Sequence, residues 1–129
     1  MNKFEKLDRE KLIIALYQYD LMKKEDFEIE ELKNIIEKLD EIDDIIVSNL
    51  TNYTINRLSF IDRAIIRLAT YELRYKDLAV AIIIDEAVNY TKKYSDLDDE
   101  KQHKFTNRLL DNIAKDIRGW LFVRYGFNS

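Results

Sequence analysis

The chain contains no proline, and its only glycines are Gly119 and Gly126. A sheet protein needs turn residues between its strands, and glycine and proline are the residues that most often form such turns. The 129 residues are enough for one domain with a sizeable core. We therefore predict an all-α fold, a compact helical bundle with short connections.

The most apolar helical pattern runs from Ser59 to Tyr75. Ser59 is a favourable N-cap, and Asp62 can reach back to its N–H in a capping box. Apolar side chains cover well over half of the helical wheel, which predicts a central helix with one narrow exposed strip. The polar residues of this strip are Arg63, Arg67, Thr70 and Arg74. Glu72 falls inside the apolar arc, so we expect it to be paired with a basic residue or a neighbouring helix end, with a functional role as the alternative.

The other segments read as helices joined by polar connections. Residues 1–7 are expected to fray, and Asp8 to cap a helix that runs to Met22. Residues 29–53 have apolar side chains at spacings of three and four, with a possible break at Asp43 and Asp44. A single helical turn is expected from Thr54. Two helices then follow, over residues 79–94 with Asp77 as the cap and over residues 101–117 with Gly119 just past the end.

The composition argues against several classes of function. There is no cysteine, and His103 is the only histidine, which we expect to be a plain surface residue. Nucleophilic catalysis, a zinc site and a glycine-rich phosphate loop are therefore poorly supported, and we expect neither an enzyme nor a cofactor or metal. No apolar run approaches a membrane span and the N-terminus lacks a signal-peptide pattern, so we expect a soluble cytoplasmic protein.

A binding surface is better supported, although the net charge of −4 does not by itself indicate a nucleic-acid partner. Basic residues at the start of the first helix and of the last helix could form one surface with an aromatic side chain. These residues are Lys6, Arg9, Lys11, Lys101, Lys104 and Phe105. Phe105 could stack an RNA base. Alternatively, Phe105 could belong to the core, and the lysines could serve only to keep the protein soluble. The arginine strip of the central helix is a second candidate, unless it pairs with the long acidic helix.

Four stretches, in order along the chain, resemble the NusB family of bacterial transcription antitermination factors. The first is R-E-K-L-I-I-A-L-Y-Q-Y-D, and the second, the most specific, is N-L-T-N-Y-T-I-N-R-L-S-F-I-D-R-A-I-I-R-L-A-T-Y-E-L. The third is I-D-E-A-V-N-Y-T-K-K-Y, where the family has an Asn-Glu-Ala helix, and the fourth is H-K-F-T-N-R-L-L-D-N-I, similar to the family's Lys-Phe-Val-Asn-Gly-Val-Leu signature. Together these stretches cover nearly the whole chain up to Ile117.

The resemblance implies a helical fold of two small subdomains over residues 1–117. It also implies binding of boxA RNA in ribosomal RNA leader transcripts together with the ribosomal protein NusE. That complex would join NusA, NusG and RNA polymerase and suppress premature termination; the free protein would be a monomer or homodimer. Residues that match the family's RNA-facing side are Arg9, Lys104 and Phe105, with Lys6 as a further candidate. Residues that match the side facing NusE are Tyr17, Leu21 and Asp62.

The chain departs from the family pattern in several places. The usual arginine-rich N-terminus is reduced to Lys3, Lys6 and Arg9, which predicts weaker RNA binding, and Arg108 stands where the signature has glycine. Residues 118–129 form an aromatic tail that we expect to dock on the bundle, or else to contact a partner or a second copy. Two alternatives stay open: an interaction module that has lost RNA binding, and a fragment of an rRNA cytosine methyltransferase.

Overall fold

The computed structural model describes residues 2–24, 29–51, 54–96 and 100–119, with side chains from Arg9 onwards. Within these residues it contains six α-helices and one 3-10 turn, and no strand. The elements are α1 (Asn2–Met22), α2 (Glu30–Glu37), α3 (Leu39–Ser48), η1 (Ile55–Arg57), α4 (Phe60–Tyr75), α5 (Val80–Tyr94) and α6 (Lys101–Arg118). The all-α prediction is confirmed, and so is the short helical turn after Thr54.

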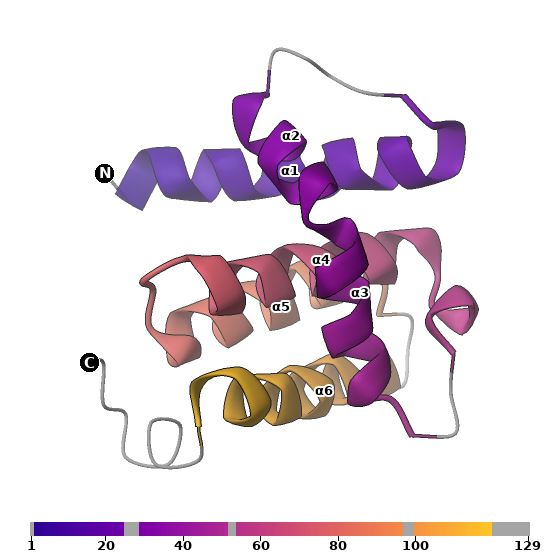
Figure 1. Cartoon of the computed structure of the whole chain (residues 1–129), viewed down its shortest axis with the longest axis vertical. Helices are drawn as coiled ribbons and strands as arrows, with labels where there is room; N and C mark the ends of the chain where they lie inside the picture. Colours follow the sequence, from indigo (N-terminus) through magenta and orange to yellow (C-terminus); the bar gives the residue numbers. More distant parts are fainter. Residues whose placement is uncertain (1, 25–28, 52–53, 97–99, 120–129) are drawn as a thin grey trace.

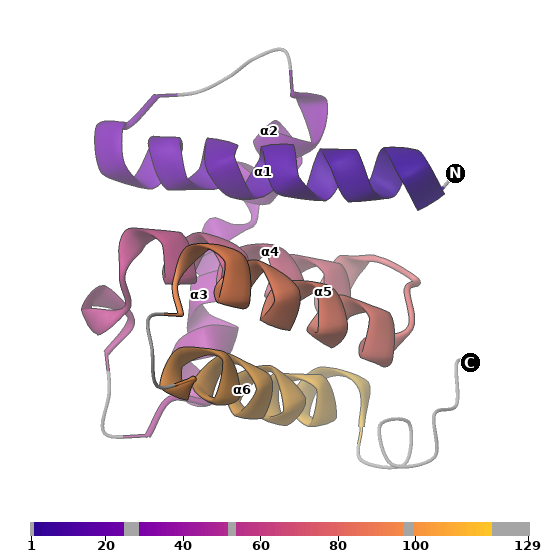
Figure 2. The ribbon, with the colours of Figure 1, turned by 180° about the vertical axis from the view of Figure 1, so that it is seen from behind.

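Helix α4 is the centre of the molecule, as its apolar pattern predicts. The helices α1, α3, α5 and α6 all pack against it. Figures 1 and 2 show α1 along one side of the α4–α5 pair and α6 along the other, while α3 crosses the α4 side of that pair and α2 packs on α1. Fully buried side chains from α1, α2, α3, α4, α5 and α6 form one core around α4. The largest of them include Ile13, Leu16, Leu32, Ile35, Ile42, Ile46, Ile65, Ile66, Leu73, Ile83, Leu110 and Ile113.

The predicted cap of α4 is present. The Ser59 hydroxyl accepts a hydrogen bond from the Asp62 N–H at 3.1 Å and donates one to the Asp62 carboxylate at 2.8 Å. The Asp62 carboxylate therefore accepts a hydrogen bond from the Ser59 hydroxyl. The predicted capping box instead had this carboxylate accept from the Ser59 backbone N–H. Both contacts stabilise the first turn of α4, and the carboxylate also lies at the positive end of the helix dipole.

Three predicted helix boundaries are wrong. Helix α1 begins at Asn2, so Asp8 lies inside the helix and not at its cap. The break in the long pattern falls at Lys38, with φ −105° and ψ 5°, and Asp43 and Asp44 lie within α3. The kink at Lys38 turns two short helices so that each buries its own isoleucines against the core. Helix α5 is preceded by Ala79 with no side-chain cap, so Asp77 is not the cap.

The predicted exposure of the arginine strip of α4 is confirmed for Arg74 and wrong for Arg63, Arg67 and Thr70. Only 7% of Arg63 is exposed and Thr70 is fully buried, because α1 and α3 cover this face. The Arg67 guanidinium makes two hydrogen bonds to the Asp43 carboxylate of α3, at 2.9 and 2.8 Å, and Arg63 binds Asp20 of α1 at 2.6 Å. The alternative, in which the strip pairs with the acidic helix, is therefore confirmed for Arg67, and the strip joins α1, α3 and α4.

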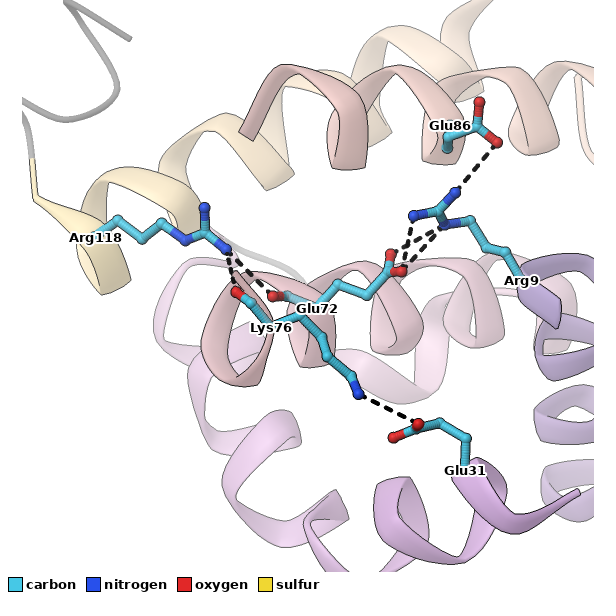
Figure 3. A network of polar contacts seen from close by, with 6 residues as sticks. All are labelled: Arg9, Glu31, Glu72, Lys76, Glu86 and Arg118. Atoms are coloured by element: carbon cyan, nitrogen blue, oxygen red, sulfur yellow. Dashed lines mark hydrogen bonds and ion pairs between the residues drawn. The ribbon is translucent and has the colours of Figure 1, made fainter. Parts of the chain in front are cut away.

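Helix α6 continues to Arg118, and Gly119 follows with φ +90°, a conformation that favours glycine. Arg118 reaches the end of α4 and donates hydrogen bonds to backbone carbonyl oxygens of its last turn and of the connection that follows, where a helix leaves carbonyl groups without partners of its own. Its acceptors are the backbone oxygens of Glu72, Leu73, Lys76 and Leu78. Arg118 thus anchors the last turn of α6 to the end of α4, as Figure 3 shows for two of these contacts.

Candidate nucleic-acid and partner interfaces

The start of α6 presents Lys104 to solvent, and the ring of its neighbour Phe105 is partly buried against the core. This turn is held by Asp96, which lies in the connection after α5. One carboxylate oxygen of Asp96 accepts the His103 N–H at 3.0 Å, and the other contacts the His103 ring. The hydrogen bond to the His103 ring lowers the pKa of Asp96 below its usual range. His103 is therefore a paired, half-buried residue and not the plain surface residue that we predicted.

Further cations lie along α6 and in the last turn of α5. Lys101, Lys104 and Arg108 are exposed and spaced by three and four residues, so they follow one face of α6. Helix α5 contributes Lys92 and Lys93 in its last turn, which the connection 95–100 joins to the first turn of α6. This arrangement gives an edge of basic and aromatic side chains at a helix N-terminus, which suits a phosphate backbone.

Arg9 occupies a different environment from Lys104. The structure places it in the interface between α1, α4 and α5, with 7% of its side chain exposed. Its guanidinium donates to the Glu72 carboxylate at 2.9 Å and lies 3.5 Å from Glu86 (Figure 3). Burial raises the pKa of Glu72 and the arginine opposes this shift. Arg9 is the basic partner that we predicted for Glu72, and in this arrangement it is not a free phosphate contact.

The structure does not bring the four predicted RNA residues into one cluster. Lys6 and Arg9 lie on α1 and Lys104 and Phe105 lie on α6, and these helices flank the α4–α5 pair on opposite sides (Figures 1 and 2). The Lys6 side chain is outside the described part of the structure. The end of α5 contacts α1 at Glu10, which accepts hydrogen bonds from Lys93, at 2.6 Å, and from the Tyr94 hydroxyl.

The predicted partner residues gather at the other end of α1. Leu21 is 45% exposed, and Tyr17 packs partly against the core. The Asp20–Arg63 ion pair fixes this end of α1 to the first turn of α4. Three further apolar side chains are exposed in this region and were not predicted from the sequence: Ile14, Met22 and Phe60. The spacing of Ile14 relative to Leu21 could have identified the stripe, because residues seven apart share a helical face.

Asp62 is 5% exposed, and its position supports the capping role. One carboxylate oxygen accepts the Ser59 hydroxyl, whereas the other is buried with no hydrogen-bond partner among the described residues. A buried oxygen of this kind needs a donor or is energetically costly. The Asp62 side chain therefore stabilises the first turn of α4 and exposes little surface that a partner could contact.

The described residues offer no sign of a metal centre or of a membrane segment. They contain no group of three or more histidine, cysteine, aspartate or glutamate side chains that could hold a metal ion. In the same part of the chain, none of the helices has the length and apolarity required to cross a bilayer.

Comparison with known proteins gives one consistent family. The family described as NusB matches residues 21–115. The transcription antitermination protein NusB of a Nitratiruptor species is 37% identical, covering 85% of this chain and 91% of its own. The Bacillus subtilis (strain 168) protein of the same name is 33% identical, covering 84% and 93%. A solved structure of T. maritima NusB superposes with a TM-score of 0.76 at 36% identity, covering 86% of this chain and 90% of that one.

Proposed function

The chain belongs to the NusB family of transcription antitermination proteins, which are not enzymes, and from this premise we propose that it binds boxA RNA together with NusE. The single observation that carries the proposal is similarity along nearly the whole chain, in sequence and in fold, to proteins named for antitermination. In this role the chain makes and breaks no bond. It assembles with NusA, NusG and RNA polymerase in the bacterial cytoplasm and thereby suppresses premature termination in ribosomal RNA operons.

We propose that RNA binds at the edge formed by the end of α5 and the start of α6. Lys104 supplies charge to the backbone, and the partly exposed ring of Phe105 offers a stacking surface for a base. Arg108 extends this edge by one helical turn and offsets part of the charge missing from the N-terminus. Lys6 lies on α1, across the α4–α5 pair from this edge, so in this proposal it is a separate contact for a longer RNA. Arg9 acts as a positioning residue, because its ion pairs fix α1 on α4 and α5.

We propose that NusE binds where α1 ends and α4 begins. Leu21 and the exposed apolar side chains around it form the contact surface, with Tyr17 at its inner edge. Exposed apolar side chains that cluster on a rigid helix pair are typical of protein interfaces. Asp62 stabilises this surface indirectly, because its hydrogen bond to Ser59 fixes the first turn of α4, next to the exposed Phe60.

The RNA proposal is tested by fluorescence anisotropy of a labelled boxA RNA titrated with the protein alone and then with NusE. We expect sequence-selective binding that strengthens with NusE and that a scrambled RNA does not reproduce. Lys104→Ala should weaken binding and lower the salt slope by about 0.7, the contribution of one phosphate on a single strand. Lys115→Ala is the matched control, because it removes an exposed lysine at the far end of the same helix. An equal effect of both variants would contradict the assignment.

The partner proposal has its own variant pair. Leu21→Asp should weaken NusE binding about tenfold or more, because a charge would be buried at the contact. Val47→Asp is the control. Val47 is an apolar residue on α3 that is 50% exposed, which is comparable to Leu21. Isothermal titration calorimetry with purified NusE measures both affinities.

A second candidate function is a protein-interaction module that binds NusE but does not read boxA. The burial of Arg9 and the acidic net charge favour it, because both reduce the positive surface available to RNA. The anisotropy experiment separates the two functions. A NusE complex that binds boxA and scrambled RNA equally weakly would support the interaction module and exclude the RNA-reading role.

A further inference from the structure

A pocket with a volume of about 630 Å³ lies between α1, the start of α2 and the end of α4. It is on neither of the surfaces proposed above for RNA and NusE. Five of its lining side chains are apolar or aromatic: Leu12, Ile29, Leu68, Tyr71 and Leu78. Its volume is in the range of cavities that bind small molecules or large side chains.

The charged groups in this pocket are mostly paired with one another. Arg9 neutralises Glu72, and Lys76 binds Glu31 at 3.2 Å (Figure 3). The Tyr71 hydroxyl also donates to the Glu31 carboxylate, so the polar atoms of this wall are satisfied. The remaining charged residues of the lining are two acids, Glu30 and Asp77, and one base, Lys11. The pocket therefore suits an apolar occupant that carries a positive charge.

Arg118 brings the end of α6 to the rim of this pocket. Its guanidinium donates to the backbone oxygens of Lys76, at 2.8 Å, and of Leu78, and both of these residues line the pocket. Gly119 then adopts φ +90°, which turns the chain away from the helical path. The end of the described chain is therefore held next to the pocket by an anchored arginine.

The sequence after Gly119 is W-L-F-V-R-Y-G-F-N-S, which lies outside the described residues and beyond the stretch that matches the family. It combines large apolar side chains with a single cation, Arg124. Four extended residues span roughly 13 Å, enough to cross from the rim into such a cavity. We infer that the segment from Trp120 to Tyr125 folds back over the end of α4 and seats its aromatic side chains in this pocket. The inference does not depend on RNA or NusE binding.

Trp120 is the only tryptophan of the chain, so its fluorescence reports on this segment alone. In the full-length protein we expect an emission maximum shifted to the blue of the urea-unfolded chain, and reduced quenching by acrylamide. Nuclear Overhauser contacts from the Trp120 indole to the methyl groups of Ile29 and Leu78 would locate it directly. Native emission and quenching equal to those of the unfolded chain would overturn the inference.

A variant pair tests the location within the folded protein. Ile29→Lys places a charge in the pocket and should shift the Trp120 emission to the red. Ile82→Lys is the control, because Ile82 is a half-exposed isoleucine of α5 outside the pocket, and it should leave the emission unchanged. Circular dichroism shows that each variant is folded. A blue-shifted emission that appears only as the protein dimerises, in parallel sedimentation runs, would assign the segment to a second copy and reject the intramolecular seat.

Discussion

The Arg9 guanidinium of α1 holds the Glu72 carboxylate of α4 with three hydrogen bonds, two of 3.2 Å from Nε and one of 2.9 Å from Nη2. Only 7% and 12% of the two side chains are exposed. The pair explains how the apolar arc of α4 accommodates a carboxylate. It also turns Arg9 inward, so a residue expected on the RNA side instead fixes α1 to the rest of the bundle.

Removal of one partner of this ion pair should be strongly destabilising. Arg9→Ala leaves Glu72 buried without its counter-ion, and we expect a loss of about 3–5 kcal/mol in the free energy of unfolding. An Arg9→Met/Glu72→Met double variant should recover most of that loss, because apolar side chains of similar size replace both charges. Urea denaturation followed by circular dichroism measures these values, with Lys11→Ala as an exposed control on α1. An Arg9→Ala variant that keeps its stability but loses RNA binding would restore the direct RNA role.

The neighbouring aspartates of α3 provide a closely matched comparison. Asp43→Asn weakens two hydrogen bonds to the Arg67 guanidinium, so we expect a loss of about 1–3 kcal/mol. Asp44→Asn removes the same charge from the next, exposed position and should change stability by less than about 0.5 kcal/mol. Thermal and urea denaturation of the two variants, side by side, check this difference. Equal effects of the two variants would mean that the hydrogen bonds between Arg67 and Asp43 do not stabilise the fold.

The stabilising contribution of Glu31 should depend on pH. Burial acts to raise the pKa of Glu31, but hydrogen bonds from Tyr71 and Lys76 outweigh it, so the pKa lies below the usual range. A carboxyl with a lowered pKa stabilises the fold above its unfolded pKa, about 4.3, and loses that contribution as the pH falls through its folded pKa. Wild type should therefore be more stable than Glu31→Gln at pH 7, and the difference should shrink below about pH 4. Urea denaturation from pH 7 to about pH 3 measures this difference; one that grows on acidification would contradict the assignment.

Arg118 should matter more for stability than its place at the end of α6 suggests. Arg118→Ala removes the donors to the carbonyl oxygens at the end of α4, and we expect a loss of about 2–3 kcal/mol. Arg118→Lys should restore only part of it, because one ammonium group cannot span acceptors that a planar guanidinium reaches together. Hydrogen exchange should show faster exchange at the end of α4 in the alanine variant. The exposed Lys115 on the same helix serves as the control position for alanine substitution.

The sequence by itself determined the features that depend on local signals. The lack of proline and the helical periodicity predicted the all-α fold, and the apolar arc over Ser59–Tyr75 predicted the central helix. The Ser59 cap and the glycine after α6 were also predictable, since caps form within a single helical turn. The family followed from four stretches in order along the chain, which the family match confirms.

Only the tertiary structure decided which polar groups face one another. Arg9 and Glu72 are 63 residues apart, and nothing local indicates that a basic residue near the N-terminus turns inward to meet α4. Arg63 and Thr70 seemed exposed on an isolated helix, and they are buried because α1 and α3 pack over them. The kink at Lys38 likewise results from packing, since it lets α2 and α3 bury their isoleucines separately. Helical periodicity identifies the apolar face of one helix, whereas the cover over its polar face depends on how distant segments pack.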